Sequence, residues 1–168
     1  MVLARQRQRE STKRGDHTGP NPTDRAKLGT KRHVLTDGRG VPIAVEITAA
    51  NIHDKWMAGA MLDAVVLRSS RGPRRPTNLC LDKGYDYAST RAVARRLRLT
   101  LHLRTRGEEV RAKRRGPKAR RWVVERTHSW LNRFRRLLVR WEKKATNYAA
   151  MLHLACATIV AGQTGLFG

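Results

Sequence analysis

The stretch "KRHVLTDGRGVPIAVEITAAN", Lys31 to Asn51, decides the fold class. Two β-prone runs flank "DGRG", a sequence typical of a hairpin because Asp and Gly favour tight turns. Beyond this stretch the apolar pattern predicts a helix, a strand, a helix, a strand and two further helices. Their expected ranges are Asp54 to Leu67, Leu79 to Leu81, Asp86 to Leu97, Leu99 to Leu103, Arg121 to Lys144, and a last helix from Ala145. Strands that alternate with helices after a hairpin predict an α/β fold, a mixed sheet flanked by helices.

The composition points to a nucleic acid as the partner. The 168 residues, 40% of them apolar, suffice for one domain with a core. Lys and Arg number 36 against 13 Asp and Glu, a net charge of +23, and such a balance favours a polyanion. An anionic membrane surface would also fit the charge. However, no signal peptide is evident, and His153 and Thr158 interrupt the most apolar stretch, so we expect no membrane partner and a cytoplasmic, nucleoid-associated protein.

Three segments divide the chain. Residues 1–30 are polar, basic and rich in turn formers, which predicts a flexible N-terminal segment in which only Met1 to Ala4 is strand-like. Residues 31–162 form the expected α/β domain, and 163–168 form a tail. Cys80 and Cys156 lie in apolar runs without the spacing of metal ligands, which is typical of reduced core residues in a cytosolic protein.

Asp82 stands at the end of the expected strand "LCL", just before a Lys-Gly break. At that place a carboxylate is either a turn-forming residue or a reactive group presented by a rigid strand. The residue alone leaves both interpretations open.

The expected helix Arg121 to Lys144 carries a second carboxylate of interest, Glu125. On a helical projection the apolar residues form one stripe, and Glu125 lies opposite it on a face rich in phosphate donors. The donors nearest to Glu125 on that face are Arg121, Ser129, Asn132, Arg133, Arg136 and Arg140. Glu125 could simply form a weak helix pair with Arg121, worth a few tenths of a kcal/mol.

Taken together, Asp82 and Glu125 suggest an acidic cluster for divalent metal within a chain built to hold DNA. Phosphodiester chemistry uses Mg²⁺ or Mn²⁺ held by carboxylates. Two such ions about 4 Å apart activate the attacking oxygen and stabilise the leaving one. Carboxylates that share two cations must come from rigid elements, which a strand end and a packed helix provide.

Three motifs resemble the catalytic region of bacterial Asp-Asp-Glu insertion-sequence transposases of the insertion-sequence-four/five superfamily. They are "GPNPTDRAKLGTKRHVLTDGRGVPIAVEITAANIHD", "DKGYD" and "RRWVVERTHSWLNRFRRLLVRWEKKATNYAAMLHLACA". The resemblance implies a ribonuclease-H-like fold, two-metal cleavage and strand transfer, and binding to the element's inverted repeats and to target DNA. By motif, Asp82 corresponds to the second catalytic carboxylate and Glu125 to the third. Arg121 and the polar residues after Glu125, from Arg126 on, resemble the signature that contacts DNA near the cut.

The family's first carboxylate lies on the opening strand of the sheet. No strand ending in Asp is evident before Lys31, and Asp16 and Asp24 lie in a Gly/Pro-rich loop. We therefore expect an incomplete first strand and no DNA cleavage by this chain alone, as for a fragment or the second frame of a split gene. It could act as a homodimer or with an upstream-frame product. The alternative is a non-catalytic DNA-binding remnant that competes with intact transposase.

Several other residues invite simpler interpretations. Asp54, in the family-like element "ANIHD", is expected to cap a helix, and His128 to lie on the surface. Three tryptophans are expected in the core rather than as stacking platforms for bases: Trp122, Trp130 and Trp141.

Overall fold

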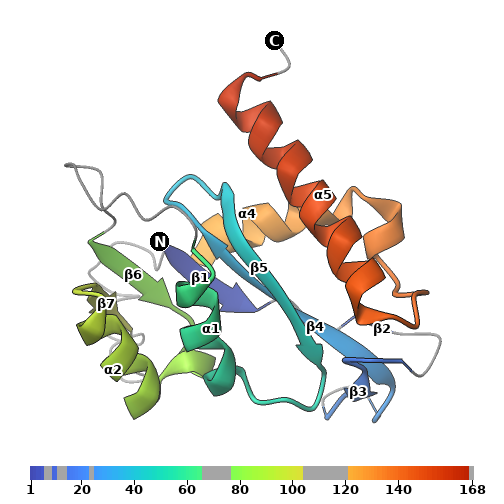
Figure 1. Cartoon of the computed structure of the whole chain (residues 1–168), viewed down its shortest axis with the longest axis horizontal. Helices are drawn as coiled ribbons and strands as arrows, with labels where there is room; N and C mark the ends of the chain where they lie inside the picture. Colours follow the sequence, from blue (N-terminus) through green and yellow to red (C-terminus); the bar gives the residue numbers. More distant parts are fainter. Residues whose placement is uncertain (6–8, 11–14, 23–24, 66–76, 104–120, 167–168) are drawn as a thin grey trace, which may run out of the picture.

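The computed structural model describes residues 1–5, 9–10, 15–22, 25–65, 77–103 and 121–166, arranged around a seven-stranded sheet (Figure 1). The strands are β1 (Val2–Arg5), β2 (Arg9–Glu10), β3 (Gly19–Pro20), β4 (Leu28–Thr36), β5 (Pro42–Ala49), β6 (Asn78–Leu81) and β7 (Thr100–His102). The α-helices are α1 (Met57–Asp63), α2 (Ala88–Arg96), α4 (Arg121–Asn132) and α5 (Ala145–Thr164). Short 3₁₀ helices are η1 (Asp54–Trp56), η2 (Lys83–Tyr85) and η3 (Arg135–Leu137).

The sheet is mixed, as the sequence predicts. β4 pairs antiparallel with β5 on one side and with β1 on the other. β1 then pairs in parallel with β6, and β6 in parallel with β7. The main strands therefore follow the order β5-β4-β1-β6-β7, with helices on both faces. This arrangement confirms the predicted α/β class and is consistent with the ribonuclease-H-like fold that the resemblance implies.

The predicted hairpin is confirmed at the turn between β4 and β5. Asp37 Oδ1 accepts hydrogen bonds of 2.8 Å from the backbone N–H groups of both Arg39 and Val41. Gly40 has φ +92°, which L side chains rarely adopt, so the second glycine of "DGRG" is required by the backbone.

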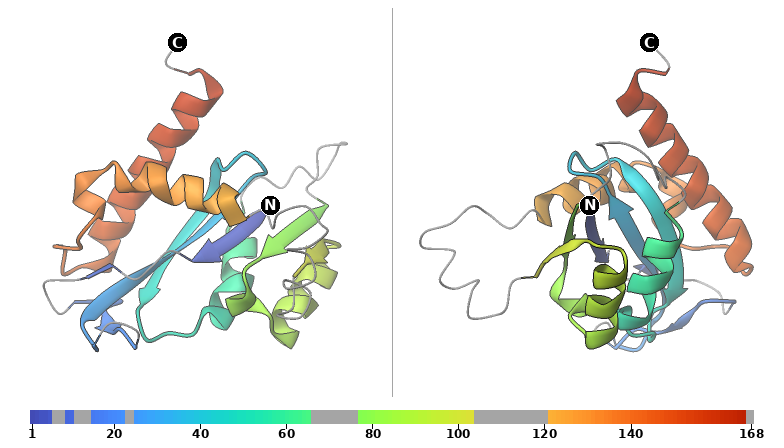
Figure 2. Two further views of the ribbon diagram at one scale, coloured as in Figure 1. Left: turned by 180° about the vertical axis from the view of Figure 1, so that it is seen from behind. Right: turned by 60° about the vertical axis from the view of Figure 1, so that its left-hand side comes forward.

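Helices cover the two faces of the sheet through separate apolar clusters. On one face α1 and α2 pack on Leu3, Leu35 and Leu79. The opposite face carries α4 and α5, with Val34 of β4 among the residues they bury. Figure 2 shows the sheet between these layers, with α4 crossing it on the side away from α1.

The helix expected to run from Arg121 to Lys144 is shorter than predicted. α4 ends at Asn132, and Phe134 is extended at φ −82° and ψ 97°. The chain then turns so that Leu137 is buried against α5, where its carbonyl accepts a hydrogen bond from the Tyr148 hydroxyl at 3.2 Å. Tertiary packing thus overrides a periodicity that continues through the sequence. Trp141, expected on the apolar stripe, is 52% exposed as a result.

The helix expected at Asp54 to Leu67 begins as the 3₁₀ turn η1, and its far end lies outside the described residues. The expectation that Asp54 caps this helix is wrong. His53 precedes η1 and its ring accepts from the N–H of Lys55, while Asp54 is buried. The 3₁₀ turn also rotates Trp56 out of the apolar face of α1, and its side chain is 68% exposed.

In the described part of residues 1–30 the chain forms β1, β2, β3 and the start of β4, where the sequence pattern indicated only Met1 to Ala4. β1 lies at the centre of the sheet, between β4 and β6. β2 and β3 have two residues each and pair with the start of β4, so they depend on that partner rather than on a pattern of their own. The basic segment 105–120 lies outside the described residues.

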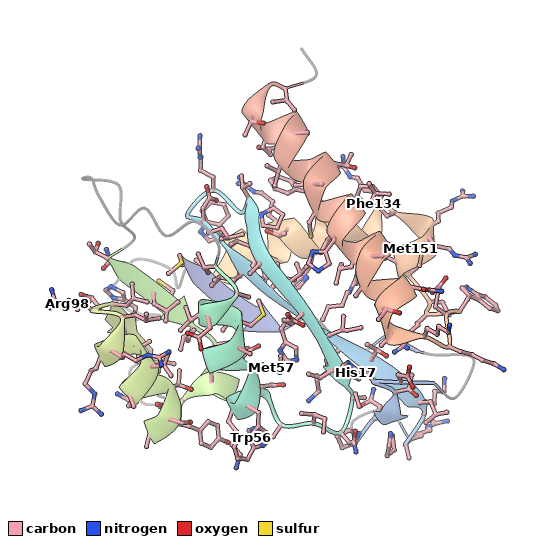
Figure 3. The ribbon with its side chains drawn as sticks, in the orientation of Figure 1. His17, Trp56, Met57, Arg98, Phe134 and Met151 are labelled. Carbon is pink, nitrogen blue, oxygen red and sulfur yellow. The ribbon has the colours of Figure 1, made fainter. Side chains whose placement is uncertain are left out.

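The last helix, expected from Ala145, is confirmed as α5. Among the described residues, α5 is the one helix long and apolar enough to cross a membrane by length and composition, although His153 and Thr158 led us to expect no such span. Six of its residues are buried, and five of those pack in the cluster shared with β4 and β5: Ala145, Tyr148, Leu152, Ala155 and Cys156. The core helix of a soluble protein can have the same length and apolar composition, so these two properties are weak evidence for a membrane span. Figure 3 shows Met151 of α5 and Phe134 at this interface.

Candidate active site

Asp82 lies at the carboxyl ends of two parallel strands, β1 and β6. Its backbone N–H donates to the carbonyl of Leu3 at 3.2 Å, which extends the β1–β6 pairing by one residue. Its own carbonyl accepts from the N–H of Tyr85 at 3.0 Å, which closes the turn η2. The backbone that carries the carboxylate is therefore fixed from both sides.

Tyr85 anchors the turn after Asp82 in the core. Its side chain is fully buried, and its hydroxyl lies 2.7 Å from His33 Nδ1. His33 Nε2 lies in turn 2.9 Å from the hydroxyl of Thr48. This series of hydrogen bonds links η2 to the neighbouring strands β4 and β5, and each polar atom in the series has a partner, as burial requires.

A buried ion pair supports the same turn. Lys31 Nζ lies 3.2 Å from Asp54 Oδ1 and donates to the carbonyl of Ile52 at 2.6 Å. The other carboxylate oxygen of Asp54 lies where a side chain on Gly84 would meet it, 2.9 Å from an ideal Cβ. The glycine of "DKGYD" is therefore needed for close approach. This network was not predicted from the sequence. Lys31 lies on β4, and nothing in the surrounding sequence indicates that its side chain is buried.

Glu125 is presented by α4, which is held on the opposite face of the sheet from α1. Val123 and Val124 pack with Val2 of β1, and Cys80 of β6 packs against the same cluster. The hydroxyl of Thr127 donates to the carbonyl of Gly40, which fastens α4 to the β4–β5 turn. Glu125 follows Val124 directly and is exposed.

The alternation of side chains along β6 relates Asp82 to this helix. Leu79 and Leu81 pack in the cluster with α1 and α2, whereas Cys80 packs beneath α4. Because successive side chains of a strand alternate in face, the continued pairing of Asp82 carries it to the α4 side. The two predicted carboxylates thus come from adjoining elements on one face of the sheet.

The predicted phosphate-binding residues differ in whether their side chains are exposed and can therefore contact DNA. Arg126, Ser129 and Arg133 are exposed. The Arg126 guanidinium lies 4.6 Å from the centre of the Trp122 ring, which is itself exposed rather than in the core. Arg121 is the first residue of α4, and its side chain lies outside the described part.

The side chains of three further residues of this region contact other parts of the fold or are buried in it. Asn132 accepts a hydrogen bond from Arg32 at 3.3 Å, and Arg136 donates to Glu142 at 3.0 Å while staying exposed. His128 is buried on the inner side of α4, not on the surface as expected.

Arg140 does not have the expected role of a phosphate ligand in this structure. Its side chain is fully buried and donates to the carbonyls of His17, Glu142 and Lys143 and to the hydroxyl of Thr30. Burial lowers the pKa of its guanidinium from the ordinary value. The projection placed Arg140 beside Glu125 because it assumed a helix that continues past Asn132. Its position instead ties the segment after α4 to the start of β4.

The carboxylate oxygens of Asp82 and Glu125 are of the type that Mg²⁺ and Mn²⁺ prefer. Among the residues that the structure describes, no group of three or more His, Cys, Asp or Glu side chains is arranged to hold a metal. The sequence of β1, "VLAR", contains no carboxylate beside Asp82. The described site thus offers two candidate ligands.

Comparisons with known proteins find sequence relatives over most of the chain. Residues 4–160 match the family model described as "Transposase DDE domain". The chain is 44% identical over 151 residues to a Burkholderia cepacia protein named "Putative transposase for insertion sequence element IS402", which covers 84% of this chain and 67% of the relative. It is 29% identical over 136 residues to the Brucella ovis protein named "Putative transposase for insertion sequence element IS6501", covering 79% of this chain and 98% of the relative. No solved structure matches the chain.

Proposed function

Because this chain belongs to the family of transposases with a DDE domain, we propose that it provides the catalytic region for metal-dependent cleavage and strand transfer at insertion-sequence ends. Asp82 and Glu125 are the proposed catalytic carboxylates. The observation that carries this assignment is the packing of α4 on β1 and β6 through Val123 and Val124, which brings Glu125 to the face that Asp82 shares. The proposed substrate is the DNA of the element's inverted repeats and of the target, in the cytoplasm.

Asp82 and Glu125 would hold Mg²⁺ or Mn²⁺. When bound, a pair of such ions activates the attacking oxygen and stabilises the leaving oxygen of the phosphodiester. The protein's own contribution is to fix the two carboxylates. The turn η2 is held by Tyr85 and Gly84, and α4 is held by Thr127.

Exposed basic and polar residues of α4 and the segment after it would hold the DNA backbone. Arg126 and Ser129 of α4 are exposed, as Glu125 is, and the exposed Arg133 follows the end of α4. Arg forks grip phosphate oxygens with two parallel hydrogen bonds and carry little sequence information. This part of the site therefore positions DNA, and Arg140 is left out of it.

We further propose that residues 1–168 bind DNA without cutting it efficiently. Two carboxylates would have to hold two mutually repelling cations, which weakens the second ion. A chain with this property would act as the alternative function, a DNA-binding competitor of complete transposase. The absence of a carboxylate in "VLAR" supports this second function.

Binding and cleavage of duplex DNA carrying the element's terminal repeats separate these functions. We expect the chain to bind the duplex and to show no efficient Mg²⁺-dependent nicking. Efficient nicking by residues 1–168 would refute the competitor function, and failure to bind DNA would refute both.

Metal binding tests the two carboxylates independently of cleavage. Titration with Mn²⁺, followed by electron paramagnetic resonance of the free ion, should show weaker binding for Asp82→Asn and for Glu125→Gln. Asp63→Asn is the matched control, since Asp63 is a partly exposed carboxylate on α1 that pairs with Arg96. Unchanged Mn²⁺ affinity in both site variants would refute the assignment.

A further inference from the structure

An exposed aromatic and basic cluster adjoins the turn that carries Asp82. It consists of His53, Lys55, Trp56 and Tyr87, and is called the Trp56 platform below. Lys55 Nζ lies 4.8 Å from the centre of the Trp56 ring and 5.7 Å from that of Tyr87. The Tyr87 hydroxyl lies 3.0 Å from His53 Nε2, with the two rings edge to face. These contacts orient the side chains of two separate segments toward one another.

The ring of Trp56 makes little contribution to the core. It is 68% exposed, and Tyr87 beside it is 37% exposed. Trp56 belongs to none of the apolar clusters that hold α1 on the sheet. A large aromatic ring kept in solvent under a lysine is a common arrangement for stacking on a planar ligand. Figure 3 shows Trp56 at the margin of the molecule, at the start of α1.

The platform is tied to the catalytic turn by the backbone and by packing. Tyr87 lies five residues after Asp82, directly beyond η2. On the other side, Asp54 of η1 contacts Gly84 within η2. The Trp56 platform and Asp82 therefore lie at the same end of β6, the platform on the α1 side of the sheet and the Asp82 side chain on the α4 side, with the buried turn between them.

The chemistry of the platform suits an unpaired nucleotide. A base freed from its neighbours stacks on an aromatic side chain whatever its identity, because every base has a π-face. The ammonium group of Lys55 would meet the adjoining phosphate. Bases inside a duplex have both faces covered by neighbours and cannot stack in this way.

We propose that the Trp56 platform binds an unstacked base of a DNA strand that passes the end of β6 at which Asp82 lies. This inference rests on the proposed function for the location of the cut. It assigns to the platform the recognition of opened or single-stranded DNA, a task separate from the gripping of duplex phosphates by α4.

Fluorescence anisotropy with labelled oligothymidine and with a labelled hairpin duplex tests the proposal on the full chain at one salt concentration. Trp56→Ala should weaken binding of the single strand by about 5- to 150-fold, the range for loss of one stacked base, and change duplex binding less than about twofold. Trp56→Phe, which keeps a ring, should recover part of the affinity. Leu154→Ala is the control, because Leu154 is a large apolar side chain that is 69% exposed on α5, outside the proposed DNA contacts, and should leave both affinities unchanged.

The possible results separate this inference from the proposed function. Equal affinity of Trp56→Ala and the unaltered chain for the single strand, with duplex binding intact, overturns the platform alone. An equal loss for both ligands also overturns it, since stacking would not affect the duplex. Failure of the unaltered chain to bind either DNA overturns the proposed function as well. Circular dichroism checks that the Trp56 variants are folded.

Discussion

Removal of Lys31 should destabilise the protein more than any exposed charge change. The Lys31 and Asp54 side chains are 5% and 4% exposed, so Lys31→Met leaves a carboxylate buried without its cation. Breaking a buried pair on one side costs about 3–5 kcal/mol of unfolding free energy. This range of unfolding free energy includes the loss of the hydrogen bond that Lys31 donates to the carbonyl of Ile52. Urea denaturation followed by circular dichroism measures this change.

Two comparison variants test the cause of that loss. Lys31→Met combined with Asp54→Asn should be less destabilised than Lys31→Met alone, because no buried charge is left. Arg96→Met removes an exposed pair with Asp63, whose side chains are 61% and 52% exposed, and should cost less than about 1 kcal/mol. A cost below about 1 kcal/mol for Lys31→Met, or a double variant less stable than the single one, would refute the reasoning.

The same variant should loosen the turn at Asp82, since Asp54 lies against Gly84. Hydrogen exchange of the Tyr85 amide, which bonds to the Asp82 carbonyl, reports this directly. Exchange should be faster in Lys31→Met than global unfolding alone explains.

Three further predictions concern other parts of the molecule. Gly40→Ala should lower the unfolding free energy by about 1–3 kcal/mol, because φ is +92° and the new Cβ would lie 3.0 Å from a carbonyl of α4; urea denaturation with no loss would contradict this. Burial raises the pKa of the Cys156 thiol to about 12, so alkylation at pH 8 followed by mass spectrometry should label Cys80 first, and stability should fall as pH rises above about 9, where the unfolded thiol ionises; faster labelling of Cys156 would count against its burial. Replacing Arg133 and Arg136 by Ala should weaken DNA binding similarly for all sequences and reduce the salt dependence by roughly one to two phosphate contacts, whereas a changed sequence preference would indicate base contacts.

Local signals in the sequence were sufficient for much of the fold. "DGRG" between two β-prone runs specifies a hairpin whatever surrounds it, and the apolar run at Leu79 to Leu81 specifies a buried strand. α5 is apolar along most of its length and needed no periodicity to be recognised. The alternation of strands and helices after the hairpin was then sufficient to predict the mixed sheet.

The site could be predicted only in part, because its supports depend on contacts between distant residues. Asp82 and Glu125 were predicted as site residues from the strand end and the helical face, whereas the buried Lys31 and the Tyr85–His33 link involve residues far apart in the chain. Arg140 was misplaced for a related reason. The apolar period continues past Asn132, but α4 ends there and Leu137 packs against α5 instead.

The central position of β1 has a consequence for how the chain folds. The β4–β5 hairpin is local and can form within about 1–10 μs. β1 must instead find partners far along the chain: Ala4 pairs with Val34 across 34 − 4 = 30 residues, and Leu3 with Leu81 across 81 − 3 = 78. Closing the longer loop costs only about 0.8 kcal/mol more free energy. β1 therefore pairs with β4 before β6 mainly because β4 is synthesised earlier. During synthesis, β1 thus gains its second neighbour only after β6 has been made, and until Cys80 has left the ribosome one edge of β1 stays open to pairing with other chains.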